Sequence, residues 1–275
     1  MSSMFAALLA AVVVGTWNGN WFPSGRAEHR AHPDVEEATS IAAAKMLARG
    51  LAEIDPSGTN DVVLCLHEMR GPRAASNLVA RIGRRGLRVV SVSDYRRRDR
   101  YDQQQDAIAT TLPVVFASWS RWKVAGKETP PRGFAFASVV TGHSVTANVY
   151  AVHLKSDYGA TTPELRALNR AKRARAAAEL VAMEKGAHVI VAGDMNADKW
   201  RKEFAEERLF SIFENAGFCN PLAQLPAETR GTHPSTRYGD SALDYVFARG
   251  FESRRPTIVP NDGLSDHYAL FVELD

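Results

Sequence analysis

The chain has 275 residues, of which 45% are hydrophobic and 24% are charged, and this balance excludes an intrinsically disordered protein. A net charge of +3 does not by itself indicate a nucleic-acid-binding protein, and two cysteines are too few for a disulfide framework. Because no linker or internal repeat interrupts the chain, we expect one domain spanning residues 1–275.

The N-terminal segment is open to two interpretations. Residues 4–14 (MFAALLAAVVV) resemble the apolar part of a signal peptide, so residues 1–11 could be a degenerate or partial signal segment. However, no Lys or Arg precedes this run, no clean cleavage site follows it, and it continues into residues 15–22 (GTWNGNWF). We therefore expect a cytoplasmic or a secreted protein, and the run is too short for a membrane span.

Strand-like and helix-like segments alternate along the rest of the chain. The apolar patterns predict strands at residues 12–17, 62–66, 87–92, 107–119, 134–140, 145–154, 188–192, 242–248 and 268–274. They predict helices from Pro33 to a stop at residues 55–58, at residues 73–83 and at residues 163–186. About ten strands are many for one open sheet, so we expect an α/β domain with two sheets packed face to face.

The helix at residues 163–186 has the clearest pattern. Gly186 suits its C-terminal cap, and Arg173 belongs to the expected polar face. The expected apolar face consists of Leu165, Leu168, Ala171, Ala174, Ala178 and Val181.

Polar side chains stand at the ends of these apolar runs more often than core strands would require. They are Asn18, His67, Glu68, His153, Asp194, Asn196, Asp244, Asp266 and His267. Ligand-binding and catalytic groups gather at strand ends in sheet proteins, and an unpaired buried charge is costly. We therefore expect these residues to form one site.

Taken alone, each residue also has an ordinary structural interpretation. These are a turn for Asn18, an ion pair with Arg70 or Arg73 for Glu68, a satisfied core histidine for His153, a helix N-cap for Asp194, and a capped turn for Asp266 and His267. The recurrence of the pattern, rather than any single residue, favours a functional site.

The residue types indicate a chemistry. Carboxylate and amide oxygens are the hard ligands that Mg²⁺ or Mn²⁺ prefers. Histidines can contact a phosphate, act as a base or donate a proton to a leaving oxygen. The set therefore predicts metal-assisted hydrolysis of a phosphoester, with Mg²⁺ or Mn²⁺ as the cofactor.

Six short segments, in order, resemble the motifs of the endonuclease/exonuclease/phosphatase family. They are residues 15–22 (GTWNGNWF), 66–71 (LHEMRG), 152–156 (VHLKS), 192–197 (AGDMNA), 242–247 (ALDYVF) and 264–270 (LSDHYAL). Each is a weak match, but the ordered series covers nearly the whole chain. The resemblance implies a four-layer sandwich of two mixed β-sheets packed face to face, with helices on both outer faces.

The resemblance also implies a role for each residue. On the metal side it places Glu68 as the main carboxylate ligand, with Asn18 and Asp266 beside it. The implied catalytic residues are Asp194 for orienting or deprotonating water, Asn196 for holding a phosphate oxygen, His267 on the scissile phosphate, His153 as a second histidine, and Asp244 for orienting a catalytic histidine. Arg132 is implied as a substrate contact, with a surface hairpin arginine as the alternative. Asp194 and Asn196 could point the same way in an extended segment.

Two departures from the family pattern stand out. His67 replaces the glutamine that usually precedes the metal-binding glutamate. In residues 103–107, Asp106 or a glutamine could stand in for the carboxylate that pairs with the second histidine.

We expect a nuclease that cleaves nucleic-acid phosphodiesters by attack of an activated water, acting as a monomer without a stable protein partner. Basic clusters at residues 81–88, 96–100 and 170–175 are either solvated surface or contacts for a phosphate-rich partner. In residues 94–101 (DYRRRDRY), tyrosines flank the arginines, as in segments that follow a nucleic-acid strand. The alternatives are a phosphodiesterase or phosphatase acting on a lipid or sugar phosphate, and a non-catalytic binding module.

Overall fold

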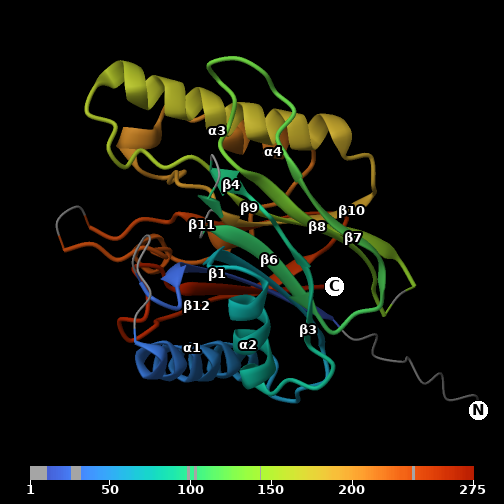
Figure 1. Cartoon of the computed structure of the whole chain (residues 1–275). Coiled ribbons are helices and arrows are strands. Elements are labelled where there is room, and N and C mark those ends of the chain that lie inside the picture. Colours follow the sequence, from blue (N-terminus) through green and yellow to red (C-terminus); the bar gives the residue numbers. More distant parts are fainter. Residues whose placement is uncertain (1–10, 26–31, 98–99, 102–103, 143, 237–238) are drawn as a thin grey trace, which may run out of the picture.

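Two mixed β-sheets pack face to face, and helices cover both outer faces (Figure 1). The computed structural model describes residues 11–25, 32–97, 100–101, 104–142, 144–236 and 239–275. The predicted four-layer α/β sandwich is therefore confirmed. Most of the N-terminal apolar run lies outside the described residues, and its last three residues begin the first strand.

The first sheet has six strands in the order β12-β13-β1-β2-β6-β3. Their bounds are Val12–Phe22 (β1), Asp61–Met69 (β2), Arg88–Val92 (β3), Gln105–Thr110 (β6), Ser253–Val259 (β12) and Ala269–Leu274 (β13). Strand β1 runs parallel to β2 and antiparallel to β13, so the first and the last strands lie side by side. Helices α1 (Pro33–Ile54) and α2 (Pro72–Ile82) cover its outer face (Figure 1).

The second sheet has five strands in the order β11-β10-β9-β8-β7. Their bounds are Val114–Arg121 (β7), Gly133–Val140 (β8), Thr146–His153 (β9), His188–Asp194 (β10) and Asp244–Arg249 (β11). Helices α3 (Pro163–Met183) and α4 (Leu209–Asn215) cover its outer face (Figure 1). The smaller elements are the hairpin of β4 (Arg96–Arg97) and β5 (Arg100–Tyr101) and the 3₁₀ turns at Lys202–Phe204, Pro221–Gln224 and Ala227–Thr229.

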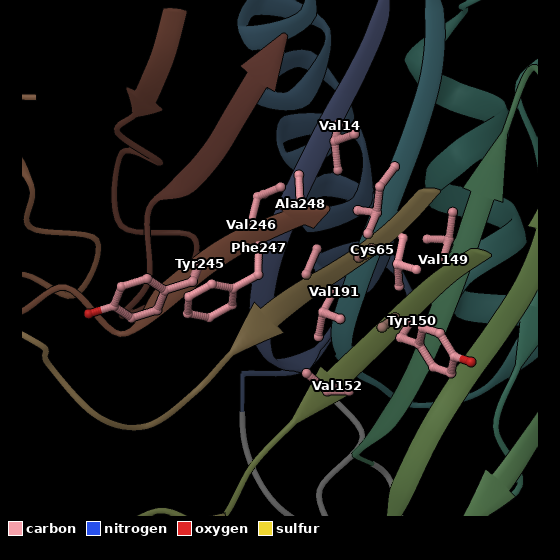
Figure 2. Close-up of a cluster of buried hydrophobic side chains, with 14 of the residues drawn as sticks. Val14, Cys65, Val149, Tyr150, Val152, Val191, Tyr245, Val246, Phe247 and Ala248 are labelled. Atoms are coloured by element: carbon pink, nitrogen blue, oxygen red, sulfur yellow. The ribbon is translucent and has the colours of Figure 1, made fainter. Parts of the chain in front are cut away.

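Alternating side chains on each strand divide between the inner and the outer face of its sheet. Figure 2 shows Val14 and Cys65 of the first sheet beside Val191 of the second, in one buried cluster. On the other face of the second sheet, Phe247 stacks on Phe213 of α4 at a centroid distance of 4.7 Å. Each fully buried side chain of this size contributes about 1.5–3 kcal/mol. Cys65 is buried and forms no disulfide.

The predicted strand at residues 107–119 is wrong in one respect, because it is two strands in two different sheets. β6 ends at Thr110 in the first sheet, and β7 begins at Val114 in the second. Pro113 has no backbone N–H to continue a ladder, and the Thr110 hydroxyl accepts a hydrogen bond from the Leu112 N–H at 3.0 Å, which turns the chain.

The predicted apolar face of α3 is also wrong. Leu165 is exposed, and the face that packs inward consists of Asn169, Arg173, Ala176, Ala177 and Leu180. Arg173 is buried because its guanidinium pairs with Glu207 and Asp157 and donates to the Lys155 carbonyl at 2.6 Å. The helix ends at Met183, so Gly186 lies beyond its cap.

Gly193 lies near the end of β10, packed against His67 of the first sheet, where no larger residue fits. A Cβ atom there would lie 1.9 Å from the Val152 carbonyl oxygen and 2.8 Å from the ring of His67, and φ is +150°.

Gly193→Ala is therefore expected to lower the free energy of unfolding by about 2–4 kcal/mol, measured by urea denaturation. Gly126→Ala is the control: φ is +102°, nothing lies within 4 Å of the added Cβ, and the loss should be about 1 kcal/mol. Equal losses of unfolding free energy in the two variants would show that the clash between the added Cβ and the Val152 carbonyl oxygen does not destabilise the protein.

No helix in the described part of the chain is both long and apolar enough to cross a membrane.

Candidate active site

Strand register brings the predicted polar residues together from both sheets. Asp194 at the end of β10 lies opposite His153 of β9 on one side and Asp244 of β11 on the other. In the first sheet, Asn18 of β1 lies opposite His67 of β2. The two sheets therefore present two rows of polar residues at one edge of the sandwich.

A local irregularity places Glu68 in this site. Its φ is +57°, and the register against β6 shifts between Leu66 and Met69, so the glutamate lies in a bulge rather than a regular strand. The Glu68 carboxylate accepts hydrogen bonds from the Trp21 N–H at 3.1 Å and from the Asn18 amide at 3.3 Å. It forms no ion pair with Arg70, which pairs with a glutamate of α1 instead.

The Asp194 carboxylate is the centre of the cluster. Its Oδ2 accepts a hydrogen bond from Asn18 Nδ2 at 3.0 Å and lies 3.5 Å from His153 Nε2 and 3.8 Å from His267 Nε2. His153 Nε2 also lies 3.7 Å from Glu68 Oε1. The side chains of Asn18, Glu68, His153, Asp194 and His267 are all buried or nearly so, and they form one cluster.

His267 is held by a second carboxylate. Its Nδ1 lies 2.7 Å from Asp244 Oδ2, while its Nε2 faces Asp194. Burial lowers the pKa of His267, but the carboxylates of Asp244 and Asp194 more than offset this and raise it to about 10. The imidazole is therefore protonated at neutral pH and can donate to a phosphate oxygen.

The pKa values of Asp194 and His153 are both shifted in the direction that favours the neutral form. Burial, followed by the charge of Asp244, raises the pKa of Asp194 to about 7, although His267 opposes this. Burial, together with the positive charge of Arg132, lowers the pKa of His153 well below its usual range. Asp194 can therefore accept a proton near neutral pH, and His153 is a neutral hydrogen-bonding group.

The sequence predicted an extended segment at Asn196, but the backbone bends there. Its φ is +51°, and its N–H donates to Asp194 Oδ1 at 2.8 Å. Its side-chain amide donates to the Leu154 carbonyl at 3.3 Å and remains half-buried beside the cluster.

Arg132 lies beside His153 and is not a free hairpin arginine. Its guanidinium donates to Gln104 and lies 3.5 Å from the carbonyl oxygens of His153 and Leu154. Its buried Nε has no hydrogen-bond partner among the described residues.

Asp266 lies next to His267 in the chain, at the exposed side of the cluster. Its half-exposed carboxylate lies 3.9 Å from His233 Nε2, and no ion pair or hydrogen bond among the described residues joins it to Asn18 or Glu68. Its place among the metal ligands stays a prediction.

His67 and Asp106, the two departures from the family pattern, contact each other beneath the site. His67 Nδ1 lies 2.8 Å from Asp106 Oδ1, and His67 Nε2 lies 3.2 Å from Thr16 Oγ1. The Tyr95 hydroxyl donates to Asp106 Oδ2 at 3.2 Å. All are buried, so a histidine and a carboxylate fill the space between the sheets.

This pair answers the question raised by residues 103–107. Asp106 does not pair with the second histidine, because its carboxylate is taken by His67, and His153 Nδ1 has no partner among the described residues. The sequence analysis identified both unusual residues but did not predict that they contact each other.

The oxygen-rich part of the cluster fits a divalent cation. Glu68 and Asp194 are buried, and among the described residues their ion-pair partners are histidines, never Lys or Arg. Two buried carboxylates joined by the Asn18 amide form a hard-oxygen set that Mg²⁺ or Mn²⁺ would neutralise. Asp194, Asp244 and His267 form a second group with donor atoms within 4.8 Å of one another, but Asp244 already occupies His267 Nδ1.

The fold and the buried carboxylate–histidine site together define a phosphoester hydrolase. More particularly, the model of the Endonuclease/Exonuclease/phosphatase family matches residues 15–267, and the chain belongs to this family. The curated proteins contain no significant match to the sequence.

Solved structures share this fold at low sequence identity. D. rerio TDP2 complexed with a single-strand DNA product has a TM-score of 0.62 and 14% identity, covering 97% of this chain and 99% of that one. Sphingomyelinase C from Streptomyces griseocarneus has a TM-score of 0.58 and 20% identity, covering 96% and 99%. An endonuclease/exonuclease/phosphatase from Beutenbergia cavernae DSM 12333 has a TM-score of 0.64 and 17% identity, covering 96% of this chain and 71% of that one.

Proposed function

We propose that the protein is a divalent-metal-dependent phosphodiesterase that cleaves nucleic acid by attack of an activated water. The single observation that carries this proposal is the position of Asp194. Its carboxylate lies within 4 Å of both histidines and is bonded to the Asn18 amide, next to Glu68. A general base, a proton donor and a metal-binding set therefore surround one small space.

Each residue has a role in this chemistry. Asn18 and Glu68 would hold Mg²⁺ or Mn²⁺, which would neutralise charge on the phosphate when bound. Asp194 orients the attacking water and accepts its proton, which its raised pKa permits at neutral pH. His267, oriented by Asp244, donates to the scissile phosphate, while the roles of His153 and Asn196 are hydrogen bonds to its other oxygens.

The surface beside Arg132 supports a nucleic-acid substrate. The Arg121 guanidinium lies over the Tyr95 ring at 5.7 Å and donates to the Arg96 carbonyl, and Trp119 packs against the same ring. Trp119 is 38% exposed. Guanidinium groups and an exposed indole can follow a phosphate backbone and stack on unpaired bases. The TDP2 structure with a single-strand DNA product is consistent with this substrate class.

An activity screen tests the proposal. Pure protein with Mg²⁺ or Mn²⁺ is expected to cleave single-stranded or plasmid DNA, or RNA, and to lose this activity in EDTA. The same screen includes a bis-aryl phosphodiester and an inositol phosphate, and Asp194→Ala is the inactive control. Cleavage of a small phosphoester with every nucleic acid left intact would contradict the nuclease.

A lipid phosphodiester is the second candidate, favoured by the similarity to sphingomyelinase C. Val115 and Phe116 are 65% and 58% exposed and could contact a membrane surface. However, they lie at the beginning of β7, whereas Arg121 at its end contacts the segment beside the site. A vesicle-sedimentation assay with sphingomyelin separates the candidates, because the nuclease should remain in the supernatant.

A further inference from the structure

A fourth histidine, His233, lies at the exposed side of the site and has no part in the chemistry described above. Its backbone exchanges two hydrogen bonds with Ser241, at 2.9 and 3.0 Å. The neighbouring Thr232 carbonyl accepts a hydrogen bond from the Tyr268 N–H at 2.6 Å, so the segments that carry His233 and His267 are bonded to each other. The two imidazole rings lie 4.8 Å apart between centroids, with their planes at 71°.

His233, Asp266 and His267 together offer three metal-ligand atoms. One donor atom from each lies within 4.8 Å of the other two, and His233 Nε2 lies 3.9 Å from Asp266 Oδ2. Tetrahedral Zn²⁺ would bring such donors to roughly 3.4 Å from one another, so a small side-chain rotation suffices. The side chains of His233 and Asp266 are 28% and 52% exposed, which leaves a path for the ion and room for a water as fourth ligand.

The surroundings of His267 suit a zinc ligand. Its Nδ1 lies 2.7 Å from Asp244 Oδ2, and a metal-binding histidine commonly gives its other ring nitrogen to a carboxylate in this way. Two imidazoles and one carboxylate are also a softer set than the oxygen atoms of Asn18 and Glu68. The two sets should therefore select different ions, Zn²⁺ at the exposed side and Mg²⁺ or Mn²⁺ inside.

We propose that His233, Asp266 and His267 form an inhibitory Zn²⁺ site. Zn²⁺ bound there would displace the proton from His267 Nε2, the nitrogen that faces Asp194 at 3.8 Å, and release it to solvent. The imidazole would then have no proton to donate to the scissile phosphate. Binding of Zn²⁺ follows from the geometry alone, whereas the inhibition rests on the proposed phosphodiesterase function.

Metal titration tests the binding without reference to any substrate. Co²⁺, added to the full-length protein with excess Mg²⁺, is expected to give the visible absorption bands of a tetrahedral site, and calorimetry is expected to show one Zn²⁺ bound. His233→Gln should weaken Zn²⁺ binding by about 10²-fold, because one of three protein ligands is lost. His188→Gln, a half-buried histidine at the other end of β10, is the matched control and should bind as the wild type does.

Glu68→Gln distinguishes this site from replacement of the catalytic metal. It should keep the Co²⁺ bands, whereas His233→Gln should lose them. In activity assays with Mg²⁺, micromolar Zn²⁺ should inhibit the wild type and His188→Gln, and His233→Gln should resist it while keeping wild-type activity without Zn²⁺. Absent bands in the wild type, or bands that survive in His233→Gln, would overturn the proposal. If no substrate is hydrolysed, the proposed function fails, and the Co²⁺ titration still decides whether the site exists.

Discussion

Replacing Asp194 by asparagine is expected to lower kcat/KM for phosphodiester hydrolysis by about 10³-fold, because the general base is lost while the side-chain shape is kept. The folded protein should survive. The pKa of Asp194 is raised from 3.8 to about 7, so its contribution to stability is present below pH 3.8 and is lost as the pH rises through 7. At pH 8 in EDTA, the variant should therefore be at least as stable as the wild type, as measured by urea denaturation and initial rates.

Asp198 provides the matched control, because it is a second buried aspartate only four residues further along. Its carboxylate accepts hydrogen bonds from the Trp200 N–H and the Ala242 N–H, both at 2.8 Å, and no histidine contacts it among the described residues. Asp198→Asn should lose stability but keep most of the activity of the folded fraction. Similar activity losses in both variants would contradict the assignment of Asp194 as the base.

Replacing Asp244 by asparagine should shift the pH dependence of hydrolysis. The pKa of His267 is about 10 in the folded protein, so the wild type should keep its proton donor up to that pH. Asp244→Asn removes the largest effect that raises the pKa of His267, while burial still lowers it. The pKa should therefore fall, and the alkaline limb of the kcat/KM profile should move to lower pH. His267→Gln should lose about 10³-fold in kcat at every pH. If Asp244→Asn leaves the alkaline limb unchanged, the contact between Asp244 and His267 does not set the pKa of the proton donor.

The same pair should give a stability that depends on pH. The pKa of His267 in the folded protein lies above its ordinary value of 6.5, so its contribution to stability is fully present below pH 6.5 and is lost as the pH rises through about 10. Urea midpoints of the wild type should therefore fall between pH 7 and pH 10 more than those of His267→Gln. Parallel curves would show that Asp244 does not stabilise the imidazolium.

The sequence could predict the sandwich and most of the site because both depend on local patterns. Buried strands appear as apolar runs, and a polar residue at the end of such a run has few structural uses. Asn18, Glu68, Asp194 and His267 were all found in this way, and the structure brings them together. The bulge at Glu68 could not be predicted, because a positive φ at a glutamate leaves no mark in the pattern.

Features that depend on contacts between distant segments escaped the sequence analysis. Arg173 has the spacing of a solvated helix face, and only Glu207 and Asp157, which are distant in sequence, explain its burial. His67 and Asp106 are 39 residues apart and meet because β2 and β6 are neighbours. His233 follows no apolar run, so no strand-end rule could have found it.

The division of the site between the sheets has a consequence for the protein during its synthesis. Residues 114–249 form the whole second sheet, and the first sheet is completed only by β12 and β13. His267 stands just before β13, which pairs with β1 at the opposite end of the chain. A nascent chain that already carries Asn18, Glu68, His153 and Asp194 still lacks its proton donor and the strand that closes the sheet. The site is therefore incomplete until β13 has been synthesised and has paired with β1.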